Sequence, residues 1–336
     1  MAMPHSASLA GARLVTIFGG SGFVGRYVAR RLAQEGWRVR VACRRPNEAL
    51  HVKVYGVVGQ VEPVFCNIRD DDSVRAALRG ADVAVNCVGI LAETGRSSFE
   101  AIQVEGAGRI ARLAAEEGCR TLVHLSAIGA DEGAESAYAS TKARGEDAVR
   151  THFPGAVILR PSIVFGPEDE FFNRFADMTR FGPALPVVGA DTRFQPVYVD
   201  DVAAAAVKGV RGEARPGIYE LGGPEVRTFR ELMAEMLTLI RRRRAVVNLP
   251  FGLANLMAGA FGLAHRASLG LVPQPITRDQ VANLRQDNVV GADAMTFADL
   301  GIVPTAMETV LPDYLWRFRK GGQYAEIKDS AARLQG

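Results

Sequence analysis

The chain of 336 residues is long enough for one large or two modest domains, and its 48% hydrophobic and 23% charged residues are the balance of an ordinary globular protein. A net charge of +3 gives no strong electrostatic footprint for nucleic acid, so we exclude that class of partner. Four cysteines without a CxxC pair argue against a disulfide framework or a zinc site and favour buried thiols in a reducing compartment.

The N-terminal segment has neither the apolar run of a secretory signal nor the arginine content of a transit peptide. We therefore expect a cytoplasmic bacterial protein or a processed organellar one. No uninterrupted apolar run is long enough to span a membrane. The nearest case, residues 245–264, is broken by asparagine, proline and glycine.

Strand and helix patterns alternate through the first half of the chain. Apolar β-branched runs predict strands, and apolar residues spaced by three or four predict helices. The expected strands are 14–18, 39–43, 61–66, 82–88, 121–126 and 156–160, and the expected helices begin near 24, at Asp72 or Ser73, at 99 and at 136. This alternation predicts a doubly wound α/β fold, a parallel sheet covered by helices on both faces.

The pattern loosens after residue 166, where a segment rich in Phe, Pro and Gly begins. An alanine-rich helix ending near 210, a strand at 218–221 and a helix at 229–240 follow. We therefore predict a Rossmann domain over residues 10–166, completed by returning elements at about 193–223. A smaller C-terminal lobe takes residues 167–192 and 224–325, and residues 326–336 form a tail.

A glycine-rich turn lies between the first strand and the first helix. Glycine there permits a tight turn, the close approach of a pyrophosphate and close packing of helix on strand. The amide groups and dipole of the following helix favour phosphate. The strand–turn–helix context makes these residues candidates for binding a dinucleotide: Gly19, Ser21, Gly22, Phe23, Val24 and Gly25.

The second strand ends in Cys43, Arg44 and Arg45, where a carboxylate would favour the ribose hydroxyls of NAD. Guanidinium groups suit a 2′-phosphate instead, through charge and geometry. The pattern predicts NADPH as the cofactor, and the alternative is a solvated basic loop.

Ser126, Tyr138 and Lys142 are the candidate catalytic residues. Ser126 ends the fifth strand, and Tyr138 and Lys142 are four residues apart on one helix face. A nearby ammonium group favours the tyrosinate, and such a Tyr can pass a proton to a carbonyl or alcohol oxygen. A surface pair is the alternative for this common spacing, but its place after the fifth strand favours the catalytic interpretation.

Together these motifs resemble the extended and atypical short-chain dehydrogenase/reductases over nearly the whole chain. Further matches are residues 86–89, 159–167, 197–203 and 221–223, while Phe18 stands where the family usually has Thr. The resemblance implies that Asn67 and Ile68 line the adenine side of the cofactor. It also implies contacts from Cys87, Val88, Gly89, Tyr138, Lys142, Pro161 and Ile163.

Within this superfamily, residues 17–28 and the distal segments 279–281 and 284–290 are most similar to one branch. That branch is the NADPH-binding accessory subunit of respiratory complex I and its bacterial relatives. The resemblance implies a subunit near the membrane that holds NADPH without known turnover. It implies a place on the cytoplasmic face of a bacterial inner membrane, or on the matrix side in an organelle. The Tyr138/Lys142 pair keeps a free reductase or epimerase open.

Four arginines at 241–244 precede an apolar stretch that runs to residue 264. A basic cluster beside an apolar helix suits an anionic membrane surface or a groove on a partner. A core helix beside a solvated arginine cluster is the alternative. We predict that residues 241–264 dock the protein at the membrane-proximal part of its complex.

Overall fold

The computed structural model describes residues 11–268, 271 and 274–322. These residues pack into two units. The first contains the described residues up to Pro161 together with Val199–Leu221 and Val290–Val303, and the second contains the other described residues. The predicted tail at 326–336 lies outside the described residues.

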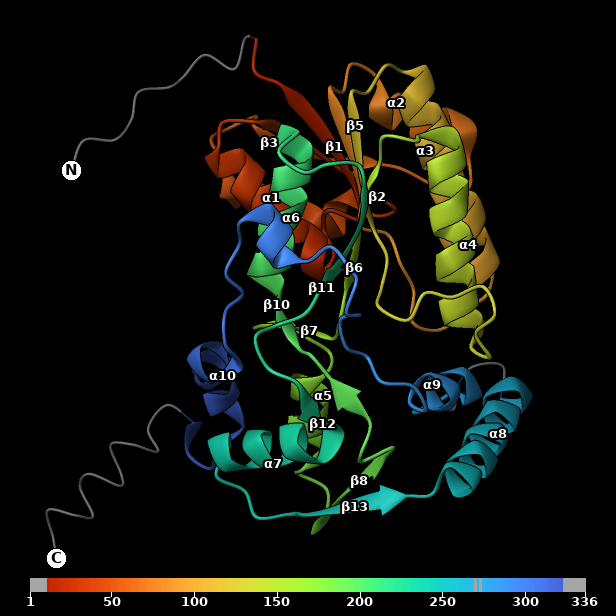
Figure 1. Cartoon of the computed structure of the whole chain (residues 1–336), viewed down its shortest axis with the longest axis vertical. Coiled ribbons are helices and arrows are strands. Elements are labelled where there is room, and N and C mark those ends of the chain that lie inside the picture. The colour runs from red at the N-terminus through yellow and green to blue at the C-terminus, as the bar shows by residue number, and fades with distance from the viewer. Residues whose placement is uncertain (1–10, 269–270, 272–273, 323–336) are drawn as a thin grey trace, which may run out of the picture. The chain divides into compact units, whose positions relative to one another are not determined.

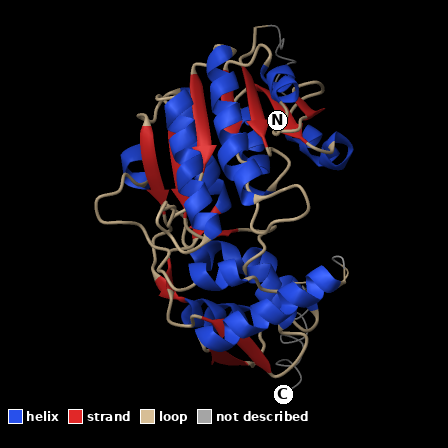
Figure 2. Ribbon diagram, turned by 90° about the vertical axis from the view of Figure 1, so that its right-hand side faces the viewer, coloured by secondary structure: helices blue, strands red, loops and turns tan. Residues whose placement is uncertain are grey.

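The first unit is built on a sheet of seven parallel strands in the order β11-β6-β5-β4-β1-β2-β3 (Figures 1 and 2). The predicted doubly wound sheet is confirmed. Every residue of β1 is buried because both faces of the sheet are covered. The strands are β1 (Leu14–Phe18), β2 (Arg38–Cys43), β3 (Val61–Phe65), β4 (Val83–Asn86), β5 (Thr121–Leu125), β6 (Val157–Pro161) and β11 (Gly217–Leu221).

Helices cover the two faces of this sheet. Figure 1 shows α1 (Phe23–Gln34) and α6 (Val199–Arg211) on one side. The other side carries α2 (Asp71–Leu78), α3 (Glu105–Glu116) and α4 (Ala137–His152). A 3₁₀ segment, η1 (Pro46–Tyr55), follows β2, and a short π-helical turn, η2 (Glu100–Val104), leads into α3.

Two details of this unit differ from the sequence prediction. Asp70, and not Asp72 or Ser73, caps α2, because its carboxylate accepts the Ser73 amide. Val290–Val303, which carries η3 (Phe297–Leu300), packs with this unit, although the sequence division had left it in the smaller lobe. The reason is local: Met295 forms a parallel bridge with Tyr219 of β11.

The second unit has short strand pairs and helices around an aromatic core. Its rings include Phe171, Phe194 and Phe229, with centroids 5.5 Å apart between Phe171 and Phe229. The strand pairs are β7 (Val164–Phe165) with β10 (Val197–Tyr198), β8 (Ala184–Val188) with β13 (Ala245–Leu249), and β9 (Arg193–Phe194) with β12 (Arg227–Thr228). The helices are α5 (Phe172–Met178), α7 (Phe229–Leu239), α8 (Phe251–Ala267), α9 (Arg278–Asn283), α10 (Met307–Leu315) and η4 (Trp316–Phe318).

The apolar stretch after the arginines is not one helix. Its β-branched start forms β13, which pairs with β8, and Pro250 separates this strand from α8. Among the described residues, no helix combines the length and the apolar character needed to cross a membrane.

Candidate functional site

The turn between β1 and α1 needs glycine at separate positions for separate reasons. Gly19 has a φ of 73°, a conformation that favours glycine. A Cβ at Gly25 would lie 2.3 Å from the Gly19 carbonyl oxygen, so only glycine lets α1 approach the turn so closely. Gly22 is exposed, has an ordinary φ of −75° and forms the N-cap of α1. The turn thus leaves backbone and open space before a helix N terminus, as a pyrophosphate requires.

The glycine turn lies beside the segment that follows β4. A Cβ at Gly19 would be 3.2 Å from the carbonyl group of Cys87 and from the Val88 amide nitrogen. A Cβ at Gly89 would in turn be 3.4 Å from Nζ of Lys142. The turn, residues 87–89 and Lys142 therefore follow one another along the carboxyl edge of the sheet, where ligands of such sheets bind.

A basic pocket of about 520 Å³ opens at the end of β2. Arg26, which the sequence analysis did not single out, joins the predicted Arg44 and Arg45 in its lining. The Arg26 guanidinium donates to the carbonyl oxygens of Gly22 at 3.2 Å and Ser21 at 3.3 Å. Three cations therefore surround the position beside the glycine turn, and they suit a phosphate group.

The two predicted arginines have different surroundings. Arg45 lies 3.1 Å from the Glu48 carboxylate, and both side chains are largely exposed. Arg44 is also exposed, and no charged partner is assigned to it among the described residues. Neighbouring Cys43 remains a thiol, because burial raises the pKa of its side chain. We therefore expect Arg44 to be the stronger phosphate contact.

Asn67 and Ile68 follow β3 on the same edge of the sheet. The side chain of Ile68 is buried, and Gly106 of α3 provides its space, since a Cβ there would lie 2.8 Å from Cδ1 of Ile68. The Ile68 carbonyl oxygen accepts a hydrogen bond of 3.0 Å from Arg109. The loop is therefore held by α3, and Asn67 is its half-buried, more accessible member.

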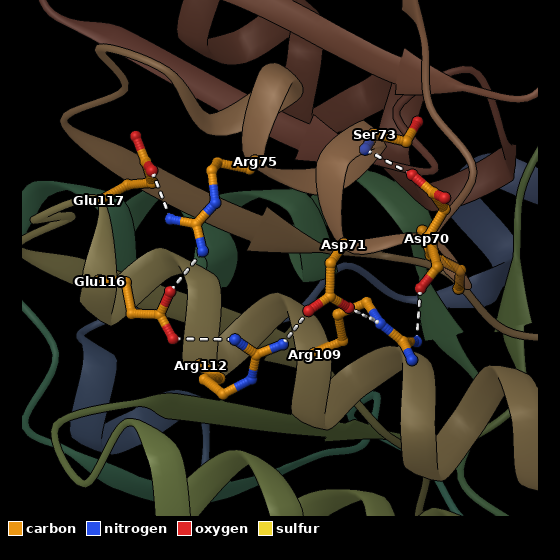
Figure 3. Close-up of polar contacts among 9 residues, drawn as sticks. Asp70, Asp71, Ser73, Arg75, Arg109, Arg112, Glu116 and Glu117 are labelled. Carbon is orange, nitrogen blue, oxygen red and sulfur yellow. Dashed lines mark hydrogen bonds and ion pairs between the residues drawn. The ribbon is translucent and has the colours of Figure 1, made fainter.

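Arg109 belongs to a ladder of charges between α2 and α3. Figure 3 shows Asp71 between Arg109 and Arg112, and Arg75 facing Glu116 and Glu117. These arginines hold the pKa of the Asp71 and Glu116 carboxyls below their ordinary values. The ladder fixes α2, and with it the loop at 67–68, against α3.

Tyr138 and Lys142 lie together on α4, as predicted from their spacing. Nζ of Lys142 is 6.0 Å from the centre of the Tyr138 ring and donates to the Leu125 carbonyl oxygen at 3.2 Å. Lys142 is 6% exposed, and burial lowers the pKa of its amine to about 8. The pair could supply a proton donor and a cation at the edge of the sheet.

Ser126 is held by a different group. Its buried hydroxyl donates to the carboxylate of Glu146, which is 1% exposed. Glu146 also accepts two hydrogen bonds from Arg160 of β6, at 2.9 and 2.8 Å. The Ser126 hydroxyl is thus hydrogen-bonded to the ion pair of Glu146 and Arg160. Its predicted catalytic role stays a prediction.

The remaining two predicted contacts belong to different units. Pro161 ends β6, and its carbonyl oxygen accepts the Ile128 amide at 3.0 Å. Ile163 lies in the second unit, where its carbonyl oxygen accepts the Val197 amide at 2.9 Å. Their shared role in the cofactor site stays a prediction.

Sequence reasoning missed Arg26, Arg109, Glu146 and Arg160. Arg26 directly follows the last glycine of the motif, which was an available signal. Arg109 donates a hydrogen bond to Ile68, which is 41 positions away in the sequence, and Arg160 donates to Glu146, which is 14 positions away. No local pattern marks such pairs, because they exist only once the helices cover the sheet.

Residues 15–222 match the model of the NAD dependent epimerase/dehydratase family. The chain is 36% identical over 320 residues to the NADH dehydrogenase [ubiquinone] 1 alpha subcomplex subunit 9, mitochondrial, of Arabidopsis thaliana, covering 92% of this chain and 79% of that protein. It is 32% identical over 315 residues to the NADH-ubiquinone oxidoreductase 40 kDa subunit, mitochondrial, of Neurospora crassa, covering 94% and 82%. A double mutant of dTDP-glucose 4,6-dehydratase from Streptomyces venezuelae, solved with NAD bound, has the same fold with a TM-score of 0.69 at 20% identity, over 90% of this chain and 96% of that one.

The family match and the geometry of the glycine turn agree on the class of ligand. The turn has the open N-cap and the close glycine packing that a pyrophosphate needs, and the matched family is described by its dependence on NAD. The chain thus has the fold and family of nicotinamide dinucleotide-binding proteins, and the carboxyl edge of this sheet is its candidate site.

Proposed function

The chain belongs to the NAD dependent epimerase/dehydratase family, and from this premise we propose that it is an NADPH-binding accessory subunit of respiratory complex I. It supports the assembly and stability of the enzyme near the membrane-proximal part of the peripheral arm. One observation carries the proposal: the two relatives named as complex I subunits align with more than nine tenths of this chain. That extent includes both packing units, and not the dinucleotide-binding part alone.

We propose NADPH over NADH because of the basic pocket. Arg26, Arg44 and Arg45 line it beside the glycine turn. Charge-assisted contacts to a phosphate favour the 2′-phosphorylated cofactor. Glu48 is the one carboxylate in the same lining, and it pairs with Arg45.

Different residues of the chain bind different parts of the cofactor. The helix N terminus at Gly22 receives the pyrophosphate, the arginines receive the 2′-phosphate, and Asn67 lies on the adenine side. Residues 87–89 lead towards Lys142, which supplies a buried cation at the nicotinamide end. When bound, such a cofactor can supply a hydride.

A free reductase or epimerase that uses Tyr138 and Lys142 is the second candidate. The observation that favours it is the closeness of these two side chains at the site edge. Tyr138→Phe separates the two functions, because proton transfer by a tyrosine contributes roughly 10²–10⁴-fold to a rate. We expect this variant to leave assembly and electron transfer to quinone intact. A loss of that size in an NADPH-dependent reaction of the isolated chain would favour the enzyme.

The place of the protein follows from the same proposal. We expect it on the cytoplasmic face of a bacterial inner membrane, or on the matrix side in an organelle, attached through other subunits. Residues 241–264 are candidates for direct contact with lipid. On α8 the small residues Ala254 and Ala258 are buried, whereas Leu256 and Leu263 are 70% and 71% exposed. This helix therefore presents its large apolar side chains outward, as an interfacial helix does.

Sedimentation of the native protein tests the main proposal. A tagged chain is extracted from its own membranes in mild detergent and separated by size. We expect the tagged chain to migrate with NADH:ubiquinone oxidoreductase activity and to carry NADPH. In a strain that lacks its gene, we expect the complex to be less stable. Migration as a single chain, with an unaffected complex in the deletion strain, would overturn the proposal.

A further inference from the structure

A chain of charges lies behind Ser126, with Glu146 buried and Arg160 and Glu220 half-buried, and the cofactor contacts above do not explain it. Glu146 lies on α4 four residues after Lys142, so the two share one face of the helix. Arg160 on β6 pairs with Glu146 at 2.8 Å and approaches Glu220 of β11 at 3.5 Å. The other oxygen of Glu220 accepts the Gly291 amide at 2.8 Å. The chain of contacts thus joins α4 to two strands and to Val290–Val303.

Such a network is costly where it is buried, since the charge of Glu146 must leave water. Hydrophobic side chains of similar volume would hold the same elements together as well or better. The position of the network beside Lys142 therefore calls for a functional reason.

The groups that face Lys142 show what that reason is. They are Tyr138 and Glu146 on its own helix, Cys87 after β4 and His124 on β5. Burial raises the pKa of the Cys87 thiol to about 12 and lowers the pKa of the His124 imidazole to about 3, so both are neutral near pH 7. Among these groups, Glu146 alone brings a negative charge.

We propose that Glu146 is a positioning residue, held in place by Ser126 and Arg160, that keeps the buried Lys142 side chain a cation where the dinucleotide binds. The inference rests on the proposed dinucleotide site. Without the carboxylate, less opposes the lowering of the amine pKa by desolvation, so the buried lysine loses its proton at a lower pH. Ser126 and Arg160 fix Glu146 by three hydrogen bonds, so the carboxylate cannot turn away to water.

The test is the pH dependence of NADPH affinity in the full chain, followed by nicotinamide fluorescence from pH 6.5 to 9.5. For the wild type we expect constant affinity at the acid end and a decline around the lysine pKa of about 8. In Glu146→Gln the decline should begin about one pH unit lower, which means roughly threefold weaker binding at pH 7.5, approaching tenfold at the alkaline end, and near-equal binding at pH 6.5. Glu146→Asp, which keeps the charge, should restore the wild-type midpoint.

Controls separate this effect from a merely structural one. Glu116→Gln, which removes a carboxylate of the α2–α3 ladder, should leave the midpoint unchanged. Lys142→Met should remove the decline altogether. If Glu146→Gln does not fold, Glu146→Gln/Arg160→Gln is titrated against Arg160→Gln, so that the two proteins differ only in the carboxylate.

The outcomes distinguish the two proposals. Equal loss of affinity at every pH in Glu146→Gln, or an unchanged curve, would overturn the role of Glu146 and leave the cofactor site intact. A wild-type chain that binds no NADPH at any pH would overturn the proposed function and this inference with it.

Discussion

Gly22 and Gly25 are three residues apart in the same turn, yet substitutions at the two positions should fail for different reasons. Gly22→Val puts its side chain where the pyrophosphate would lie, and among the described residues only the Gly19 carbonyl oxygen, at 3.2 Å, lies within 4 Å of the added Cβ. Gly25→Ala instead forces a Cβ to within 2.3 Å of that oxygen. We expect the first to lose NADPH and keep its fold, and the second to lose about 1–3 kcal/mol of stability.

Two measurements check this contrast: retained NADPH after purification, and the denaturant midpoint of the apoprotein. Gly36→Ala serves as a strained-backbone control, since Gly36 has a φ of 82° with open space around it. NADPH retained by Gly22→Val would contradict the assignment of the turn.

Arg44 and Arg45 should contribute unequally to the choice of cofactor. Arg44→Ala removes a guanidinium with no assigned charged partner in the described structure, whereas Arg45 is partly neutralised by Glu48. A lost charge-assisted contact to phosphate costs about 1.5–3 kcal/mol, or roughly 10–150-fold in NADPH affinity. We expect a loss in that range for Arg44→Ala, a smaller loss for Arg45→Ala, and little change in NADH affinity for either. Equal NADPH and NADH affinities in the wild type would remove the basis of the NADPH assignment.

At the scale of helices and strands, the sequence predicts those elements whose signals lie in adjacent residues. The run at 14–18, the glycine turn and the amphipathic start of α1 are signals from adjacent residues, and the structure has each of them. The nature of β13 was missed, because a short and mostly apolar run fits a strand or a helix until its partner β8 is known. Glu146 of α4 was missed for a similar reason, since its partner Ser126 directly follows β5 and its partner Arg160 lies in β6.

The four arginines at 241–244 do not all have the same surroundings. Arg242 donates to the carbonyl oxygens of Thr179 and Phe318, and Arg244 donates to Thr179 as well. All four arginines line a cavity of about 840 Å³, but Arg242 and Arg244 are half-buried and bind backbone, whereas Arg241 and Arg243 are exposed. Membrane or partner contact should therefore depend on the second pair.

We expect Arg241→Gln/Arg243→Gln to be attached to membranes more weakly than the wild type at low salt, to lose less of its attachment as salt rises, and to keep its fold. Each basic residue near an anionic surface contributes about 1 kcal/mol, and salt screens the attraction. Arg242→Gln/Arg244→Gln is the matched control, and it should lower stability with little effect on the salt dependence. Membrane fractions at low and moderate salt provide the measurement. Equal attachment of the first pair and the wild type under both conditions would leave the arginines without a docking role.

At the scale of the whole molecule, the first unit carries a pH sensitivity that comes from its core. His124 lies in β5, its Nδ1 is 3.1 Å from the Asn86 amide nitrogen, and its Nε2 is buried without an assigned hydrogen-bond partner in the described structure. Burial first, and the charge of Lys142 second, lower the pKa of its imidazole from 6.5 to about 3. The folded state therefore holds His124 neutral at pH values where the unfolded chain protonates it.

It follows that the unfolded state binds one more proton than the folded state between these two pKa values, so the first unit loses stability as the pH falls below 6.5. The expected slope from this one residue is about 1.4 kcal/mol per pH unit. We expect His124→Gln, which cannot take up that proton, to unfold with a smaller slope between pH 5 and 6.5. Both proteins carry Trp316→Phe, so that fluorescence of the buried Trp37 reports the first unit alone. The absolute stability of the variant can change in either direction, so the comparison concerns the slope. Parallel curves for the two proteins would show that protonation of His124 does not oppose folding in acid.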